Sequence, residues 1–109
     1  MSFVAIFVTC GSRKEANVII DALLEKRLVA CASVIGGIVS RFWWKGRIDK
    51  AREVLVVLKT RRANFKKVEA LVRRLHSYEV PEIIALPLEW ASADYLKWLG
   101  ESVKKKGRI

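Results

Sequence analysis

The sequence lacks glutamine, has only two asparagines and contains a single histidine, His76, among its 109 residues. Hydrophobic residues make up 52% and charged residues 29% of the chain, a composition that excludes a disordered polypeptide. A chain of this length has room for one hydrophobic core, so we expect a single domain over residues 1–109. Scarce amides beside many charges are typical of proteins from thermophiles and predict a thermostable protein.

Cysteine is also scarce, because Cys10 and Cys31 are the only two in the chain. They stand apart without C-x-x-C spacing, which excludes a disulfide framework and a zinc knuckle. The apolar stretch Phe3–Val8 has no basic segment before it and is too short to cross a membrane. We therefore expect a protein of the reducing cytoplasm that does not associate with a membrane.

Sequence motifs typical of enzymes are absent as well. The chain contains no nucleophile elbow, no glycine-rich phosphate loop and no pair of carboxylates at a recognisable spacing. We therefore expect that the protein is not an enzyme.

The net charge is +10, from 21 Lys and Arg against 11 Asp and Glu. Such an excess favours acidic partners, but the basic residues are dispersed along the chain, which favours a solvated surface. A sheet that binds RNA would present aromatic side chains from its central strands. Only Phe3 and Phe7 qualify here, so nucleic acid is the partner that we expect least.

The first half of the chain has the pattern of a strand, a helix and a long β-hairpin. The apolar run Phe3–Val8 is typical of a strand at the centre of a sheet. Ser12 with Glu15 three residues later forms a capping box, which predicts that a helix begins there. The predicted hairpin comprises an extended segment at 30–44 with a bulge at Gly36–Gly37, a turn at Lys45–Gly46 and a second strand at 54–58.

The second half has the pattern of a helix, a short strand and a final helix. Apolar residues recur at helical spacing from Phe65 to Leu75, so we expect a helix with a buried stripe there. Pro81 and Pro87 bracket a strand at 83–86 and favour an edge position for it, because proline donates no hydrogen bond. Ser92 is the expected N-cap of the last helix, whose predicted buried stripe is Tyr95, Leu96, Leu99 and Val103.

This order of elements predicts an α+β domain of the ferredoxin-like type, βαββαβ with an added C-terminal helix. Two βαβ crossovers with a hairpin between them form a split βαβ sheet. The first and third strands are central in that topology, and they are the most apolar strands of this chain. The element order and the distribution of apolar residues therefore agree.

The predicted hairpin is long for a domain of this size, and its outer strand would expose unpaired N–H and C=O groups. Trp43 and Trp44 are adjacent near its tip, where strand alternation points them to opposite faces. One of them could reach the core of its own chain. The other would then need a packing surface from a second subunit. The alternative is a local aromatic cluster at the tip.

Several short motifs lie between the first strand and about residue 99. They are Leu28-Val29-Ala30-Cys31-Ala32, Ser40 with Trp44 and Gly46, Lys59-Thr60, His76-x-Tyr78-Glu79-Val80-Pro81-Glu82-Ile83, and Tyr95-Leu96-x-Trp98. Together they resemble the motifs of the CutA family, the segment from His76 most specifically. No single motif would suffice, but the set covers nearly the whole chain.

The resemblance implies a homotrimer whose hairpins, with Trp43 and Trp44, meet around a threefold axis. It also implies a role in tolerance of divalent metal ions, copper above all, so that copper or another divalent metal is the expected cofactor. The chain departs from the family at Ser77, where proline is usual, and at Thr9-Cys10-Gly11, where Thr-x-Pro is frequent. Both departures lie near the expected cleft, so ligand binding can differ in detail.

The candidate metal ligands are His76, Cys31, Cys10 and Glu82, with Glu79 as a second carboxylate. Imidazole is the commonest metal ligand, and thiolate suits Cu(I). Both cysteines are near strand ends, which permits them to converge at one end of the sheet. A closed site needs about four ligands, so a complete site would include a neighbouring subunit. Without a metal, His76 would stabilise a helix C-terminus and Cys31 would be a small buried hydrophobe.

The alternative function is a trimeric sensor of an anionic small molecule. Lys59, Arg61, Arg62 and Tyr78 are the residues that could line an anion pocket at a subunit boundary. Trimeric signalling proteins with ferredoxin-like folds support this hypothesis by analogy of fold alone. Metal binding is the first prediction and the sensor is the second.

Overall fold

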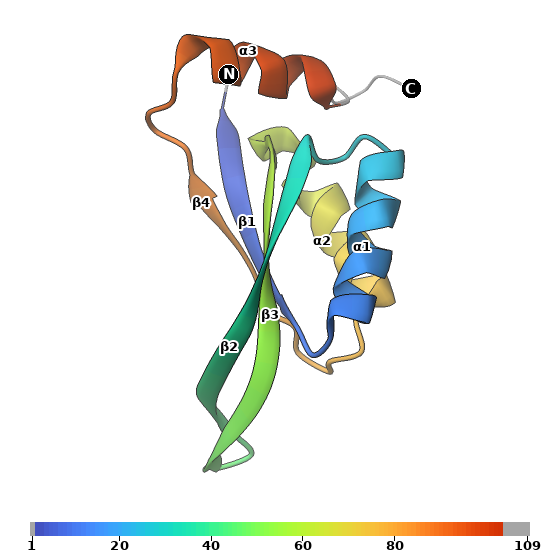
Figure 1. Cartoon of the computed structure of the whole chain (residues 1–109), viewed down its shortest axis with the longest axis vertical. Helices are drawn as coiled ribbons and strands as arrows, with labels where there is room; N and C mark the ends of the chain where they lie inside the picture. The colour runs from blue at the N-terminus through green and yellow to red at the C-terminus, as the bar shows by residue number, and fades with distance from the viewer. Residues whose placement is uncertain (1, 104–109) are drawn as a thin grey trace.

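The structure, a computed structural model, describes residues 2–103 and is shown in Figure 1. Its elements follow the predicted order, with a short 3₁₀ helix before the second α-helix. They are β1 (Phe3–Cys10), α1 (Arg13–Glu25), β2 (Cys31–Trp44), β3 (Arg47–Arg61), η1 (Arg62–Asn64), α2 (Phe65–Leu75), β4 (Ile83–Pro87) and α3 (Ala93–Ser102). The α+β prediction is therefore confirmed.

The four strands form one antiparallel sheet in the order β2-β3-β1-β4. β1 and β3 are central, as the ferredoxin-like topology requires, and their apolar composition follows from that position. β4 is an edge strand that ends at Pro87, which pairs with Val4. An edge tolerates proline because one side of an edge strand makes no ladder hydrogen bonds.

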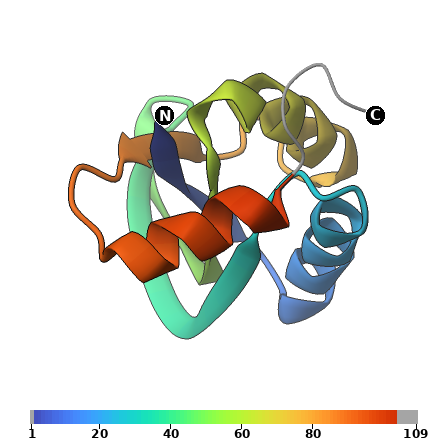
Figure 2. The same ribbon diagram turned by 90° about the horizontal axis from the view of Figure 1, so that it is seen from above.

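The hydrophobic core lies between one face of the sheet and helices α1 and α2, which both views show side by side (Figures 1 and 2). Alternate residues of β1 point into this core. The buried set comprises Val4, Ile6, Val8 and Cys10 from β1, Val54, Val56 and Leu58 from β3, Ala16, Ile19, Ile20 and Leu23 from α1, Val68, Leu71 and Val72 from α2, and Leu28 and Val29 from the segment after α1. Strand alternation therefore places Cys10 on the helix side of the sheet, at the end of β1.

The β2–β3 hairpin is longer than predicted, because β3 spans Arg47–Arg61 rather than 54–58. The predicted bulge is confirmed by a shift of register between Ile35 and Ile38. The predicted turn is confirmed too, since Lys45 and Gly46 have φ of 51° and 80°. Two successive positive φ angles are typical of a two-residue hairpin loop that follows the strand twist. The hairpin projects past the helices and makes the molecule 43 Å long (Figure 1).

Neither tryptophan at the hairpin tip reaches the core of its own chain. Trp43 is 73% exposed and Trp44 is half-buried. They pair with Ile48 and Arg47 of β3, beside the turn. The expectation that one of them packs into the core is wrong, because the tip lies beyond the body of the domain.

α3 crosses the end of the sheet at which β1 begins (Figure 1). Ser92 caps it as predicted, and its hydroxyl accepts the N–H of Tyr95. Leu99 and Val103 are buried as predicted, whereas Tyr95 and Leu96 are only half-buried. The buried stripe is therefore narrower than predicted, because α3 covers the end of the sheet and not its middle.

Arg61, the last residue of β3, connects α3 to the sheet. Its side chain is buried, donates a hydrogen bond to the carbonyl of Gly100 in α3, and has its guanidinium carbon 5.5 Å from the centre of the Phe3 ring. A guanidinium over an aromatic face is attracted by the ring quadrupole. This basic residue therefore has a packing role.

The face of the sheet opposite α1 and α2 is largely uncovered. Ile35 of β2 and Ile84 and Leu86 of β4 are exposed apolar residues on this face. An antiparallel sheet with one open face normally presents polar side chains to water. Apolar side chains on an open face indicate that another surface covers them.

Candidate metal centre

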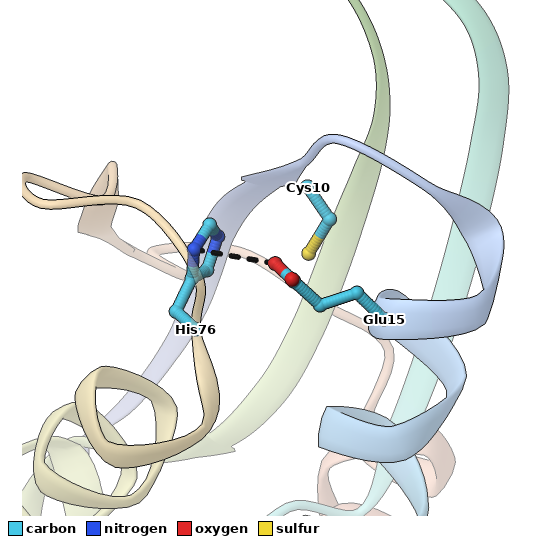
Figure 3. A group of neighbouring side chains, drawn as sticks. All are labelled: Cys10, Glu15 and His76. Atoms are coloured by element: carbon cyan, nitrogen blue, oxygen red, sulfur yellow. Dashed lines mark ion pairs between the residues drawn. The ribbon is translucent and has the colours of Figure 1, made fainter.

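Three residues that are distant in the sequence lie together at the end of β1 (Figure 3). Cys10 is the last residue of β1, Glu15 lies in the first turn of α1, and His76 is the C-cap of α2. One ligand atom from each, the Cys10 sulfur included, lies within 4.8 Å of the other two. Thiolate, carboxylate and imidazole are metal ligands, and we call this group the Cys10–Glu15–His76 cluster.

The turn between β1 and α1 brings Glu15 to the cluster. The Ser12 hydroxyl caps α1 and accepts a hydrogen bond from the Glu15 N–H at 3.1 Å. In a full capping box the Glu15 carboxylate would reach back to the Ser12 N–H. Its Oε2 lies instead 3.3 Å from Nδ1 of His76. The predicted N-cap is confirmed, and the carboxylate has a second contact that the capping motif did not indicate.

His76 is buried, and both of its ring nitrogens have hydrogen-bond partners. Nε2 lies 2.8 Å from the carbonyl oxygen of Thr9. Because a carbonyl oxygen only accepts, Nε2 carries the proton of the neutral ring. Nδ1 then carries the lone pair of the ring, which accepts the main-chain N–H of Tyr78 at 3.1 Å. This tautomer is the one that leaves Nδ1 able to bind a metal.

The Glu15 carboxylate is not fully satisfied. Its Oε2 is buried and has no hydrogen-bond partner among residues 2–103. Nδ1 of His76, 3.3 Å away, forms an ion pair with this oxygen only when the ring is protonated. In the neutral tautomer it has no proton to donate, and two electron-rich atoms lie next to each other. A buried polar atom without a partner costs free energy of folding. A cation bound between the two atoms would remove this conflict, so the donor set fits a metal ion.

The surroundings of Cys10 keep its thiol protonated. Burial raises the pKa of Cys10 to about 11, and the negative charges of Glu15 and Glu53 act in the same direction. A cysteine must lose this proton to bind a metal ion. Cys10 is therefore a ligand only for a cation that displaces the proton, and such binding weakens as the pH falls.

Tyr78 and Glu53 lie between the cluster and a pocket of about 830 Å³, which we call the hairpin pocket. The Tyr78 hydroxyl donates to Oε2 of the buried Glu53 at 2.7 Å, and the Tyr78 and His76 rings are 4.7 Å apart. Burial, the bond to Glu53 and nearby negative charges raise the pKa of Tyr78, so its phenol stays a donor. The lining of the pocket comprises Thr9, Glu53 and Tyr78 with residues 40–44, 49–51 and 79–82.

Cys31 is not part of the cluster. It pairs with Lys59 of β3, whereas Cys10 pairs with Val54. These two positions on β3 are about 17 Å apart at ~3.4 Å per residue of strand. The convergence of the two cysteines that the sequence permitted is therefore wrong for a single chain. Cys31 is half-buried, with its sulfur 3.7 Å from the Tyr95 hydroxyl.

The four residues predicted to line an anion pocket do not lie together. Lys59 and Arg61 are at the α3 end of β3, where Arg61 is buried, and Arg62 is exposed beside them. Tyr78 lies at the other end of the sheet. Its hydroxyl donates a hydrogen bond there to Glu53, which, like Lys59 and Arg61, is a residue of β3. These four residues therefore do not form a pocket within one chain, because β3 carries its basic residues away from Tyr78. A pocket at a subunit boundary stays a prediction.

Glu82, the predicted carboxylate ligand, and Glu79 line the hairpin pocket and are both exposed. The carboxylate in the cluster is Glu15, which sequence reasoning assigned to helix capping alone. Sequence reasoning also missed Glu53, because in the sequence it is simply a single charged residue that precedes an apolar run. One sequence signal could have indicated Glu15. The loop after Cys10 is short, so the first turn of the following helix lies next to the end of the strand.

Residues 4–102 match the family described as CutA1 divalent ion tolerance protein. The chain belongs to this family. The divalent-cation tolerance protein CutA of Archaeoglobus fulgidus is 40% identical over 99 residues, which are 91% of this chain and 96% of that protein. The protein of the same name from Thermus thermophilus is 38% identical over 97 residues, 89% of this chain and 94% of that protein. The CutA resemblance of the sequence motifs is confirmed.

Some CutA relatives are much longer than this chain. Protein CutA of Mus musculus is 43% identical over 106 residues, which are 94% of this chain but 60% of the mouse protein. The match to Protein CutA of Homo sapiens covers 53% of that protein. The chain thus spans little more than half the length of these mammalian CutA proteins.

Solved CutA1 structures have the fold of this chain. The structure from Thermus thermophilus has a TM-score of 0.91 at 36% identity and covers 94% of this chain and 99% of that chain. CutA1 from Oryza sativa has a TM-score of 0.93 at 29% identity and covers 97% of both. The ferredoxin-like prediction is therefore confirmed as the CutA1 fold.

The predicted compartment stays a prediction. The CutA structure from Archaeoglobus fulgidus, with a TM-score of 0.90 at 39% identity, is described as a periplasmic divalent cation tolerance protein. Among residues 2–103, no helix is both long enough and apolar enough to cross a membrane.

Proposed function

We propose that this member of the CutA1 family binds a divalent cation, copper most tightly, at the Cys10–Glu15–His76 cluster. The observation that carries the proposal is the buried Oε2 of Glu15, which has no hydrogen-bond partner among residues 2–103 and lies 3.3 Å from Nδ1 of His76, beside the Cys10 sulfur. A cation bound there would neutralise Glu15 and take the place of the thiol proton. It would also replace the hydrogen bond that Nδ1 accepts from Tyr78.

The donor set supports a transition metal over a hard cation. One sulfur, one imidazole nitrogen and one carboxylate oxygen suit Zn²⁺ and copper, whereas Ca²⁺ and Mg²⁺ prefer oxygen ligands alone. Among divalent first-row metals, affinity for such donors is highest for Cu²⁺. Three protein ligands leave a coordination position for water or another group, which is typical of a site that exchanges its ligand.

The test is a titration of the full chain with Cd²⁺, a soft cation without redox chemistry, followed by thiolate-to-metal charge-transfer absorption. Cys10→Ser should lower the affinity for Cd²⁺ by on the order of a hundredfold or more. It removes a metal ligand itself, which costs more than the loss of a residue that only hydrogen-bonds to a ligand. His76→Ala should have a comparable effect. Because binding displaces a proton, the affinity of the wild type should rise between about pH 5 and 8.

Cys31→Ser is the matched control for this titration. It changes the same chemical group at the opposite end of the sheet, so the Cd²⁺ affinity and the absorption band should be those of the wild type. Loss of the band in Cys31→Ser together with its retention in Cys10→Ser would contradict the proposed site. Copper is then compared with Cd²⁺ by competition under anaerobic conditions.

We also propose that three copies of the chain assemble through the open sheet face and the hairpin. The apolar residues on the open face and the exposed Trp43 need a covering surface, and in a closed ring of three copies each copy covers this surface on the next. Light scattering at micromolar concentration should give about three times the chain mass of 12.4 kDa. A monomer would contradict the proposal.

We propose no catalytic activity for this site. We do not propose the anionic sensor either, because the basic residues predicted for it lie at the end of the sheet remote from Tyr78. The cytoplasm remains the compartment that we expect, since free thiols such as Cys10 and Cys31 persist in a reducing environment.

A further inference from the structure

The Glu15 side chain is 19% exposed, but its Oε2 and the other two residues of the Cys10–Glu15–His76 cluster are buried, so a cation needs a path to these ligand atoms. Cys10 and His76 are both buried, and the ring of Tyr78 lies against that of His76. Tyr78 also lines the hairpin pocket, which Cys10 and His76 do not. Tyr78 and Thr9 both line the pocket, and the Thr9 carbonyl accepts the hydrogen bond of His76. Pocket and cluster therefore share a wall.

The hairpin pocket is acidic although the chain is basic. Four of the 11 Asp and Glu residues of the chain line it, namely Asp49, Glu53, Glu79 and Glu82. Of the 21 Lys and Arg residues, Arg41 and Lys50 are the two that line it within residues 2–103. A cleft lined mainly by one sign of charge concentrates counter-ions and speeds their association. In a chain with a net charge of +10, this pocket is a surface that attracts cations.

We propose that the hairpin pocket is the entrance through which a divalent cation reaches the Cys10–Glu15–His76 cluster, and that Tyr78 closes this entrance. The inference rests on the proposed function, because it takes the cluster as the destination. The exposed Glu79 and Glu82 attract the cation into the pocket. The buried Glu53 holds the Tyr78 hydroxyl in the closed position.

Two hydrogen bonds of Tyr78 couple the entrance to the cluster. Its hydroxyl donates to Glu53, and its N–H donates to Nδ1 of His76. A cation that reaches Glu53 competes for the carboxylate oxygen and weakens the first bond. Movement of the Tyr78 side chain then opens the way to the cluster, where the cation competes with the main-chain N–H of Tyr78 for the Nδ1 lone pair. The first bond thus controls the passage of the cation, and the second is exchanged for the metal once the cation arrives.

Gly11 permits the closed position of Tyr78. A Cβ at residue 11 would lie 3.2 Å from the Tyr78 hydroxyl oxygen, a tight contact next to the bond that this hydroxyl makes. Gly11 also follows Cys10 directly, so the closed side chain lies against the loop that leads out of the cluster. A side chain at this position would push Tyr78 away from Glu53.

Stopped-flow mixing of the full chain with Cd²⁺ tests the entrance, with charge-transfer absorption as the signal. The double variant Glu79→Gln/Glu82→Gln should lower the association rate by about tenfold at low salt and leave the dissociation rate within about twofold. The difference should vanish at 1 M salt, where the Debye length is about 3 Å. Glu25→Gln/Glu101→Gln, which removes the same charge from exposed positions on α1 and α3, is the matched control and should associate like the wild type.

Tyr78→Phe tests the closing residue, because it deletes the hydroxyl that binds Glu53 and keeps the ring. Association and dissociation should both accelerate several-fold, with the equilibrium affinity unchanged within about twofold. Equal association rates for the pocket variant and its control, or unchanged rates in Tyr78→Phe, would overturn the proposal. If Cys10→Ser binds Cd²⁺ as the wild type does, the proposed function fails, and this outcome is separate from a failure of the entrance.

Discussion

The two ends of the sheet each carry one cysteine, in opposite electrostatic surroundings. At the end of β1, Cys10 lies near two carboxylates that help to raise its pKa to about 11. At the other end, Cys31 pairs with Lys59, whose pKa is raised by a hydrogen bond with Tyr95. The Cys10 end has a carboxylate oxygen without a partner, whereas Arg61 at the Cys31 end is bound to α3.

This difference separates two uses of polar residues within one small sheet. The cationic end is closed by a helix of the same chain, so its charges contribute to packing. The acidic end leaves an unsatisfied acceptor and a large pocket, so its charges suit a cation from solution. The comparison predicts that substitutions at the α3 end change the stability of the fold and that substitutions at the Cys10 end change its response to metal and pH.

The largest effect on stability is expected for Arg61→Ala. This variant removes a charged hydrogen bond to Gly100 and the contact with the Phe3 ring, and should lower the free energy of unfolding by about 2–3 kcal/mol. The neighbouring Arg62→Ala alters an exposed side chain and should change it by less than about 0.5 kcal/mol. Urea unfolding at one protein concentration measures both. Equal changes in the free energy of unfolding for Arg61→Ala and Arg62→Ala would mean that Arg61 does not anchor α3 to the sheet.

An effect of comparable size, but absent at neutral pH and confined to alkaline pH, is expected from Cys10. Its pKa rises from the ordinary 9.0 to about 11 on folding, so the folded chain retains the thiol proton more tightly than the unfolded chain does. The resulting stability is present below pH 9 and is lost as the pH rises from 9 to 11, by about 2–3 kcal/mol. Urea unfolding across this range should show the loss in the wild type and in Cys31→Ala.

In Cys10→Ala, the part of the loss of stability at alkaline pH that comes from the Cys10 thiol should be absent. The lysines and tyrosines that also titrate at high pH are common to all three proteins, so the difference between Cys10→Ala and the wild type isolates the buried thiol. An identical pH dependence in the two would show that Cys10 is not buried among negative charges. The two ends of the sheet would then differ less than the structure indicates.

The fold was predictable because its signals are local and periodic. The continuous apolar run of β1, the serine N-caps of α1 and α3, the glycine bulge and the Lys45–Gly46 turn each depend on a few adjacent residues. The bounds of β3 were missed, because its outer half is polar and projects beyond the core. Its length is determined by pairing with β2 and not by its own composition.

The candidate site was predictable only in part. Cys10 and His76 were found as scarce residue types with metal-binding chemistry, and His76 lies in the most specific motif. Cys31 has the same chemistry, and nothing in its own segment separates it from Cys10. The register of β3 makes that distinction, since Val54 and Lys59 place the two cysteines at different ends.

The sequence by itself determined the family, the order of the elements and the two scarce ligand types. These properties follow from residue identity and from spacing along the chain. Only the tertiary structure decided that Glu15 joins Cys10 and His76, because the three come from a strand, a helix start and a helix end. It also decided that four carboxylates of a basic chain gather at one pocket, since charges remote in sequence become neighbours when the hairpin and residues 79–82 come together.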